Sequence, residues 1–477
     1  MQNIKSLVQS NNKEFYILFL TEMWERYGFY VIQTLLIFYL SHHLKLQDTT
    51  SYIIVGSFTA LAYINCFFGG LIADKLIGSV RSVFIGGVLL STGYSLLSLT
   101  NGYSMLHLAL AIITVGTGFM KPNITALVGE INSKEDDTTK GNKYTVYYMG
   151  IYIGALCGSL AGSMIQVHFG WQHAFLSAAI GSIISTLTFW YGIYKYSFTG
   201  WNAHPRISCG KYLSTFILIL IITFVSYCTL YSDMLSFIYF ILLGIFAMGY
   251  ILYNIISHHG YARQQLITFF ILIVLSVCYW GIYFQQFFSL SLCIDRVAMK
   301  TSIPTSALSA IESFGIILFG PVINQIWTYY SNRNNPVSNI KRVSLGFLFN
   351  AISFTLIAGG LFYASNTHQY LPIFVIMCAY MIIAIGELSI APTQLSMVTK
   401  LVPHNMTATM TGISLISIGF GGKLAGILAN DSAVLSQTLQ ITQNNYAFSF
   451  LKYAIFSMMI FVSMFVIKIY LNRKKYD

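Results

Sequence analysis

Long apolar runs, separated by short polar connections, make up almost all of the 477-residue chain. An α-helix needs about 20 apolar residues to cross a bilayer, and each run is close to that length. The pattern therefore predicts roughly fourteen membrane-spanning helices. Their expected ranges are about 15–40, 51–73, 82–99, 104–126, 144–166, 172–195, 212–231, 234–257, 267–293, 304–328, 343–364, 370–399, 407–429 and 446–471.

The helices divide naturally as six, two and six, which suggests two bundles joined by an inserted pair. We expect an N-terminal six-helix bundle over 1–195, two inserted transmembrane helices with their linkers over 196–265, and a C-terminal six-helix bundle over 266–477. The predicted fold class is an all-α polytopic membrane protein.

Composition agrees with this class, because 56% of the residues are hydrophobic and only 9% are charged. Soluble domains usually carry about 25% charged residues. A net charge of +11 would suggest nucleic acid as the partner of a soluble chain. Here the basic residues fall in connections between spans, so we expect a lipid bilayer and no nucleic acid.

The distribution of Lys and Arg predicts the orientation. With the N-terminus in the cytoplasm, the outer side of the membrane keeps only Lys45, Arg296, Lys300 and Lys452. Cytoplasmic loops are normally the ones enriched in Lys and Arg. Both termini are therefore expected in the cytoplasm, with no cleaved signal peptide because residues 1–13 are polar.

Three charged residues interrupt the first apolar run. Glu22 and Arg26 are spaced i,i+4 and Glu22 and Glu25 i,i+3, so all three share one helix face. Charges at membrane depth are costly unless they pair or face a wet cavity. The pattern favours a buried proton or ion site over a helix end whose charges reach the headgroups.

Other charges also lie inside predicted spans. Lys121 is in GTGFMKPN at 116–123 and Glu387 is in GELSIAP at 386–392, where glycine and proline predict broken helices. Irregular backbone at that depth lines protein or a watery cavity. We therefore predict one cavity with a cation from the first half and a carboxylate from the second. The alternative is a structural staple between the halves. Glu312 and Lys423 are also within spans and have no single clear role.

Five stretches, taken together, resemble the signatures of the proton-dependent oligopeptide transporters of the major facilitator superfamily. They are EMWERYGFY at 22–30, GGLIADKLIG at 69–78 followed by Arg81, GTGFMKPN at 116–123, YYMGIYIG at 147–154 and GELSIAP at 386–392. The resemblance covers the whole chain, and bacterial members share the two extra central helices. It implies a major facilitator fold and a gate motif that includes Gly70, Asp74, Gly78 and Arg81.

The resemblance also implies roles for the charged residues. Glu22, Glu25 and Arg26 would form the proton-coupling cluster. Glu387 would receive the amino terminus of a peptide and Lys121 its carboxylate. The tyrosines and tryptophan that line the family's pocket correspond to Tyr30, Tyr63, Tyr148 and Trp280.

The chain departs from the family pattern at several positions. Gln33 stands where a second arginine is usual, and Phe284 stands where the family has a glutamate. Since the family pairs these two charges, their joint absence is coherent: one alone would be an unpaired buried charge. Tyr152 and Glu312 stand where pocket asparagines are usual. Glu312 could take over the proton role lost at Phe284.

The expected function is proton-coupled import of di- and tripeptides by alternating access. We expect no enzymatic activity, no metal and no cofactor, because the sequence shows no metal-ligand spacing, activated nucleophile or nucleotide-binding motif. A proton gradient would supply the energy, and a monomer in the bacterial inner membrane would be the functional unit. The alternatives are a carrier or exporter of a cationic or amphipathic metabolite, and a membrane sensor that does not transport.

Overall fold

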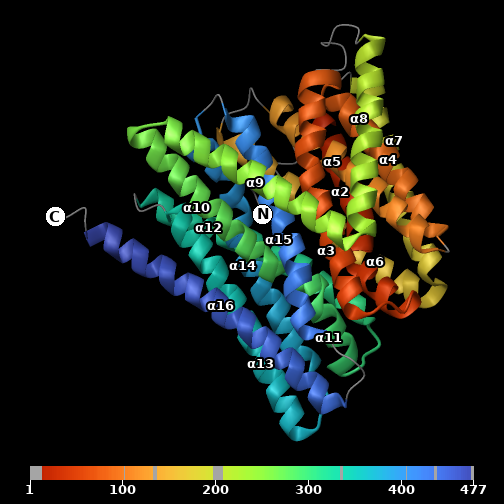
Figure 1. Ribbon diagram of the computed structural model, residues 1–477, viewed down its shortest axis with the longest axis vertical. Helices are drawn as coiled ribbons and strands as arrows, with labels where there is room; N and C mark the ends of the chain where they lie inside the picture. Colours follow the sequence, from red (N-terminus) through yellow and green to blue (C-terminus); the bar gives the residue numbers. More distant parts are fainter. Residues whose placement is uncertain are drawn as a thin grey trace. The chain divides into compact units, whose positions relative to one another are not determined.

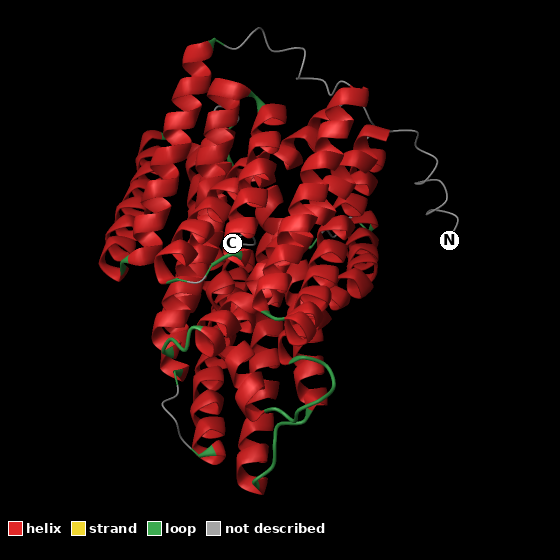
Figure 2. Cartoon of the chain, turned by 90° about the vertical axis from the view of Figure 1, so that its right-hand side faces the viewer, coloured by secondary structure: helices red, strands yellow, loops and turns green. Residues whose placement is uncertain are grey.

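The computed structural model describes residues 13–100, 102–132, 137–196, 208–333, 337–403, 406–433 and 438–473. Figure 2 shows this part of the chain as helices joined by loops, with no strand drawn within it. Within the described residues, 13 helices are long and apolar enough to cross a membrane. The charged first helix, α2 (Lys13–Phe38), is a further long helix. The prediction of an all-α polytopic membrane protein is confirmed.

The helices form two compact units. Unit 1 comprises Met1–Leu35 and Leu61–Phe237, and unit 2 comprises Leu36–Ala60 and Ile238–Asp477. Unit 1 contains α2 as far as Leu35, the second half of α3 (Asp48–Ile72), the π-helical turn η2 (Ala73–Ile77), α4 (Ser79–Ser98), α5 (Tyr103–Ile131), α6 (Asp137–Phe169), α7 (Trp171–Tyr196) and α8 (Cys209–Tyr231). Figure 1 labels its α-helices.

Helix α2 lies directly against α6 in unit 1. A Cβ atom at Gly154 would lie 2.2 Å from the carbonyl oxygen of Met23, and one at Gly158 would lie 2.4 Å from that of Tyr27. Only glycine allows backbones to approach so closely. This contact covers the α2 segment that carries the charged residues.

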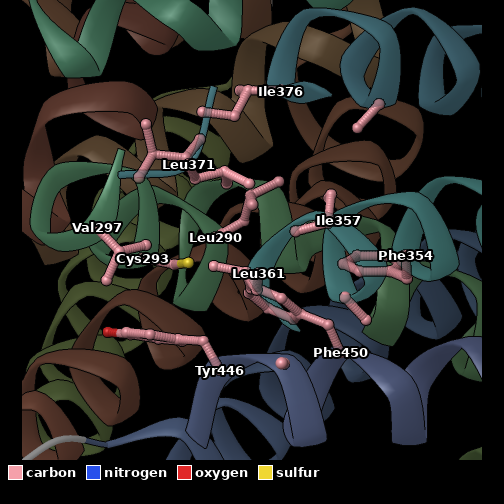
Figure 3. Packing of buried hydrophobic residues seen from close by; sticks show 14 of the residues in the cluster. Leu290, Cys293, Val297, Phe354, Ile357, Leu361, Leu371, Ile376, Tyr446 and Phe450 are labelled. Carbon is pink, nitrogen blue, oxygen red and sulfur yellow. The ribbon is translucent and has the colours of Figure 1, made fainter. Parts of the chain in front are cut away.

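Unit 2 contains the remaining elements. They are η1 (Tyr39–His43), the first half of α3, α9 (Asp233–Ser257), α10 (Gly260–Tyr283), η3 (Phe284–Phe287), α11 (Ser289–Val297), η4 (Thr305–Ser309), α12 (Ala310–Asn332), α13 (Asn339–Thr367), α14 (Ile373–Leu401), α15 (Thr407–Ala429), η6 (Asn430–Ser432) and α16 (Leu439–Arg473). Figure 3 shows part of its core, where Leu290 and Cys293 of α11 lie near Leu361 of α13 and Phe450 of α16.

The division into units does not follow the order of the chain. Helix α3 changes units after Ala60, and α9 changes units after Phe237. The inserted pair is therefore shared, with α8 in unit 1 and most of α9 in unit 2. The predicted segments 1–195, 196–265 and 266–477 stay a prediction.

The prediction of broken helices around Lys121 and Glu387 is wrong. Helix α5 runs through Pro122 and α14 runs through Pro392 without interruption. The glycines of α5 instead serve helix packing, since a Cβ at Gly118 would lie 2.5 Å from the backbone oxygen of Asn65. An interruption occurs in the expected span 267–293, where α10 ends at Tyr283 and a 3-10 turn follows.

Candidate functional site

The charged residues of α2 are buried within unit 1. The exposed fractions of Glu22, Glu25 and Arg26 are 1%, 0% and 2%. The Arg26 guanidinium donates from Nη2 to Glu25 Oε1 at 2.6 Å, and its Nε also contacts Glu25 Oε2. Arg26 Nε lies farther from Glu22 Oε1, at 3.5 Å. Side chains this buried do not reach headgroups, so the snorkelling alternative is wrong.

The pairing is asymmetric, and this asymmetry gives the two glutamates different chemistry. Glu25 has a bidentate contact with Arg26, which is the strongest geometry for a carboxylate and a guanidinium. Glu22 contacts Arg26 at the longer distance of 3.5 Å. Protonation of Glu22 therefore removes a weaker ion pair than protonation of Glu25 would.

Lys121 belongs to the same neighbourhood of unit 1. Its Nζ lies 4.2 Å from the centre of the Tyr63 ring, within the range of a cation–π contact. Its positive charge also interacts with Glu22, which Tyr147 contacts through its hydroxyl. The structure thus brings together a partly exposed cation, an aromatic ring and a buried carboxylate that the sequence had predicted separately.

The other predicted pocket residues of unit 1 lie on α2 and α6. Tyr30 and Gln33 follow Arg26 along α2 by one and two turns, and the charge of Arg26 interacts with Tyr30. Tyr148 on α6 is 37% exposed, and Tyr152 is half-buried. A common pocket for these residues stays a prediction.

The predicted residues of unit 2 form a buried polar and aromatic group. The Tyr283 hydroxyl lies 2.9 Å from Glu312 Oε1 and 2.7 Å from Glu387 Oε2. Trp280 donates its indole N–H to Gln394 at 2.7 Å. The Trp280 ring is 5.6 Å from that of Phe284, measured between centroids. Tyr283, whose hydroxyl contacts both glutamates, matches none of the motifs in the sequence.

The role of residues 69–81 as a gate stays a prediction, but the structure shows the local geometry of this motif. Gly78 has φ +79°, a conformation that favours glycine, and Arg81 donates to the carbonyl of Ile77 at 3.2 Å. Asp74 lies in η2 and is exposed. Gly69 is in close contact with α5, since a Cβ at Gly69 would lie 2.1 Å from the Gly118 oxygen, whereas a Cβ at Gly70 would meet no atom within 4 Å.

Two interactions of unit 2 follow from no local sequence pattern. Arg296 of α11 makes a bidentate ion pair with Asp48 at the start of α3, with N–O distances of 2.6 and 2.7 Å. Lys423 of α15 donates to the Ser57 hydroxyl at 2.9 Å. The sequence pattern places Arg296 in a loop on the outer side, whereas the structure places it in the last turn of α11. No group of three or more potential metal ligands occurs in the described part of the chain.

Comparison with known proteins extends these observations. The model of the POT family matches residues 80–445. Dipeptide and tripeptide permease B of Aliivibrio fischeri is 27% identical over 441 residues, which are 90% of this chain and 88% of that protein. Dipeptide and tripeptide permease A of Salmonella typhimurium is 26% identical over 476 residues, which are 98% of this chain and 93% of that protein.

Solved structures show the same fold. One of them comes from work on substrate recognition in proton dependent oligopeptide transporters, and it matches with a TM-score of 0.85 at 23% identity. The match covers 96% of this chain and 99% of that chain. The crystal structure of tetrameric PepTSo2 matches with a TM-score of 0.84 at 22% identity, covering 96% and 98% of the two chains.

Proposed function

Because the chain belongs to the POT family, we propose that it is a proton-coupled symporter that imports di- and tripeptides by alternating access. Relatives named dipeptide and tripeptide permeases support peptides as the cargo. The observation that carries the proposal is the buried cluster of Glu22, Glu25 and Arg26 beside Lys121. Charges buried in a membrane helix mark an ion or proton pathway.

Substrate binding uses a cation and a carboxylate. Lys121 receives the peptide's carboxylate, and Glu387 receives its amino terminus. Because these groups are common to all peptides, recognition does not depend on the side chains. The aromatic residues Tyr30, Tyr63, Tyr148 and Trp280 supply apolar contacts, and Gln33, Tyr152 and Phe284 modify selectivity at positions where the chain departs from its family.

Proton binding changes the charge beside Lys121. A proton from the outer side adds to the Glu22 carboxylate and removes its attraction for Arg26 and Lys121. Lys121 is then available for the peptide carboxylate, while Glu25 keeps its bidentate contact with Arg26. Release of the proton inside restores the attraction between Glu22 and Lys121 and displaces the substrate. Glu312 contributes a second proton-binding carboxyl.

The setting follows from the same proposal. The protein lies in the bacterial inner membrane with both termini in the cytoplasm, because the basic connections then face inward. The gate motif with Gly70, Asp74, Gly78 and Arg81 lies at the cytoplasmic side. A proton gradient supplies the energy without a cofactor, and a single chain carries out transport.

Uptake of radiolabelled dialanine into proteoliposomes tests the proposal. We expect accumulation under an inward proton gradient and its loss when an ionophore collapses the gradient. Competition by other di- and tripeptides should reduce the uptake. Gradient-driven flux of an organic cation, with no competition by peptides, would favour a carrier of non-peptide metabolites instead.

A further inference from the structure

Trp280 of α10 is held by a glutamine from another helix. Its indole N–H donates to Oε1 of Gln394, on α14, at 2.7 Å, and both side chains are buried. An indole has one N–H donor and no acceptor, so this hydrogen bond uses all of its hydrogen-bonding capacity. Trp280 therefore offers other molecules only the carbon surface of its ring.

The amide of Gln394 is itself fixed in one orientation. Its Nε2 lies 3.0 Å from the carbonyl oxygen of Ser414 and 3.2 Å from Ser417 Oγ, and both serines belong to α15. The Ser417 hydroxyl also lies 3.1 Å from Ser276 Oγ on α10. A flipped amide would place its nitrogen opposite the indole N–H, and two donors cannot bond each other. The network thus keeps the amide oxygen turned to Trp280.

The Trp280 ring is close to a carboxyl group of unit 2. Trp280 packs edge to face against Tyr283, with 4.9 Å between the ring centroids. The Tyr283 hydroxyl lies 2.7 Å from Glu387 Oε2. In a peptide, the first side chain is attached one carbon from the amino group. If Glu387 binds the amino terminus, the first side chain of the peptide is therefore the one nearest to Trp280.

We propose that Gln394 is a specificity-determining residue: by binding the Trp280 N–H, it makes the surface beside the peptide's first side chain apolar and so favours peptides with an apolar first residue. The proposal rests on the proposed function and specifies its substrate class. A polar first side chain loses its water here and gains no hydrogen bond from the ring, which costs free energy. Gln394 acts through Trp280, so it is a positioning residue.

Two dipeptides separate polarity from shape. Leucine and asparagine have branched side chains of similar shape, but asparagine carries a carbonyl and an amino group where leucine has two methyl groups. The KM of leucyl-alanine and of asparaginyl-alanine is measured in proteoliposomes under an inward proton gradient. In the wild type we expect the KM of asparaginyl-alanine to be higher by about 5-fold or more. Equal KM values would overturn the proposal, whereas absence of uptake of both dipeptides would contradict the proposed function.

Gln394→Met removes the acceptor of the indole N–H and keeps a side chain of similar length. The N–H can then donate to the asparagine carbonyl. We expect the KM of asparaginyl-alanine, relative to that of leucyl-alanine, to fall by about 2- to 10-fold, as for one hydrogen bond. An unchanged ratio would show that Gln394 does not set selectivity. The wild-type comparison tests the proposal even where the variant fails to fold.

Ser417→Ala is the matched control. It removes a hydroxyl from the same network but leaves the hydrogen bond between Trp280 and Gln394 in place. We expect this variant to keep the wild-type ratio of the two KM values. If Ser417→Ala lowers the ratio as much as Gln394→Met does, looser packing of the helices accounts for the change, and the proposal is wrong.

Discussion

The ammonium of Lys121 lies 4.2 Å from the centre of the Tyr63 ring. A cation over an aromatic face gains about 0.5–1 kcal/mol at partly exposed sites, and the ring fixes the direction of the lysine side chain. Tyr63 thus orients the proposed carboxylate-binding group.

Replacement of the Tyr63 ring should weaken peptide transport. We expect Tyr63→Leu to raise the KM for dialanine by about 2- to 5-fold, which corresponds to loss of the cation–π contact. Tyr63→Phe keeps the aromatic face and serves as the matched control. Concentration-dependent uptake in proteoliposomes measures both. An equal KM for the leucine variant and the wild type would show that the ring does not orient Lys121.

Removal of the Arg26 charge should destabilise the protein. Arg26→Met leaves the buried Glu25 carboxylate without its cation, at an expected cost of about 3–5 kcal/mol. The double variant Glu25→Gln with Arg26→Met removes both charges and should recover most of the lost stability without recovering proton-driven uptake. Thermal unfolding in detergent measures the first effect. Unchanged unfolding of Arg26→Met would contradict the buried ion pair.

Two adjacent glycines should respond differently to alanine. A Cβ at Gly69 would lie 2.1 Å from the Gly118 oxygen, whereas a Cβ at Gly70 would meet no atom within 4 Å. We expect Gly69→Ala to lower stability by about 1–3 kcal/mol through overpacking, and Gly70→Ala to unfold like the wild type. Thermal unfolding of the purified variants measures the difference. If the two lose the same stability, α3 and α5 are not in close contact at Gly69.

The ion pair of Asp48 and Arg296 should contribute to stability, because it is bidentate and mostly shielded from solvent. Asp48→Asn should cost about 1.5–3 kcal/mol, the range for hydrogen bonds to charged groups. The exposed pair of Lys452 and Asp431, at 3.1 Å, provides the control, since Lys452→Ala should change stability by less than about 1 kcal/mol. Thermal unfolding of both variants is the measurement, and equal effects would argue against a specific role for Arg296.

Much of the fold could be predicted from the sequence because the membrane restricts the possible structures. Apolar runs of sufficient length identify the helices, and Glu22, Glu25 and Arg26 stand out because charges are rare there. Proline and glycine were less informative. Pro122 is accommodated within α5, and the nearby Gly118 serves close packing against α3.

The contacts between distant segments could not be read from local patterns. Tyr283 joins glutamates that lie 29 and 104 positions farther along the chain. Nothing distinguishes its hydroxyl from those of other tyrosines in apolar runs. The partner of Arg296 was likewise invisible, since Asp48 lies 248 positions earlier and outside the expected span. Such pairs depend on how helices pack, which periodicity does not specify.

We propose that Lys121 and Glu387 bind opposite ends of one peptide. The test is a competition experiment, in which dialanine amide and acetyl-dialanine compete with dialanine for uptake. The inhibition is compared among the wild type, Lys121→Ala and Glu387→Gln. In the wild type both blocked peptides should compete poorly. In Lys121→Ala, dialanine amide should compete as well as dialanine does, while acetyl-dialanine still competes poorly. In Glu387→Gln, acetyl-dialanine should compete as well as dialanine does, while the amide still competes poorly. If both variants transport dialanine and discriminate as the wild type does, these residues do not bind the two ends.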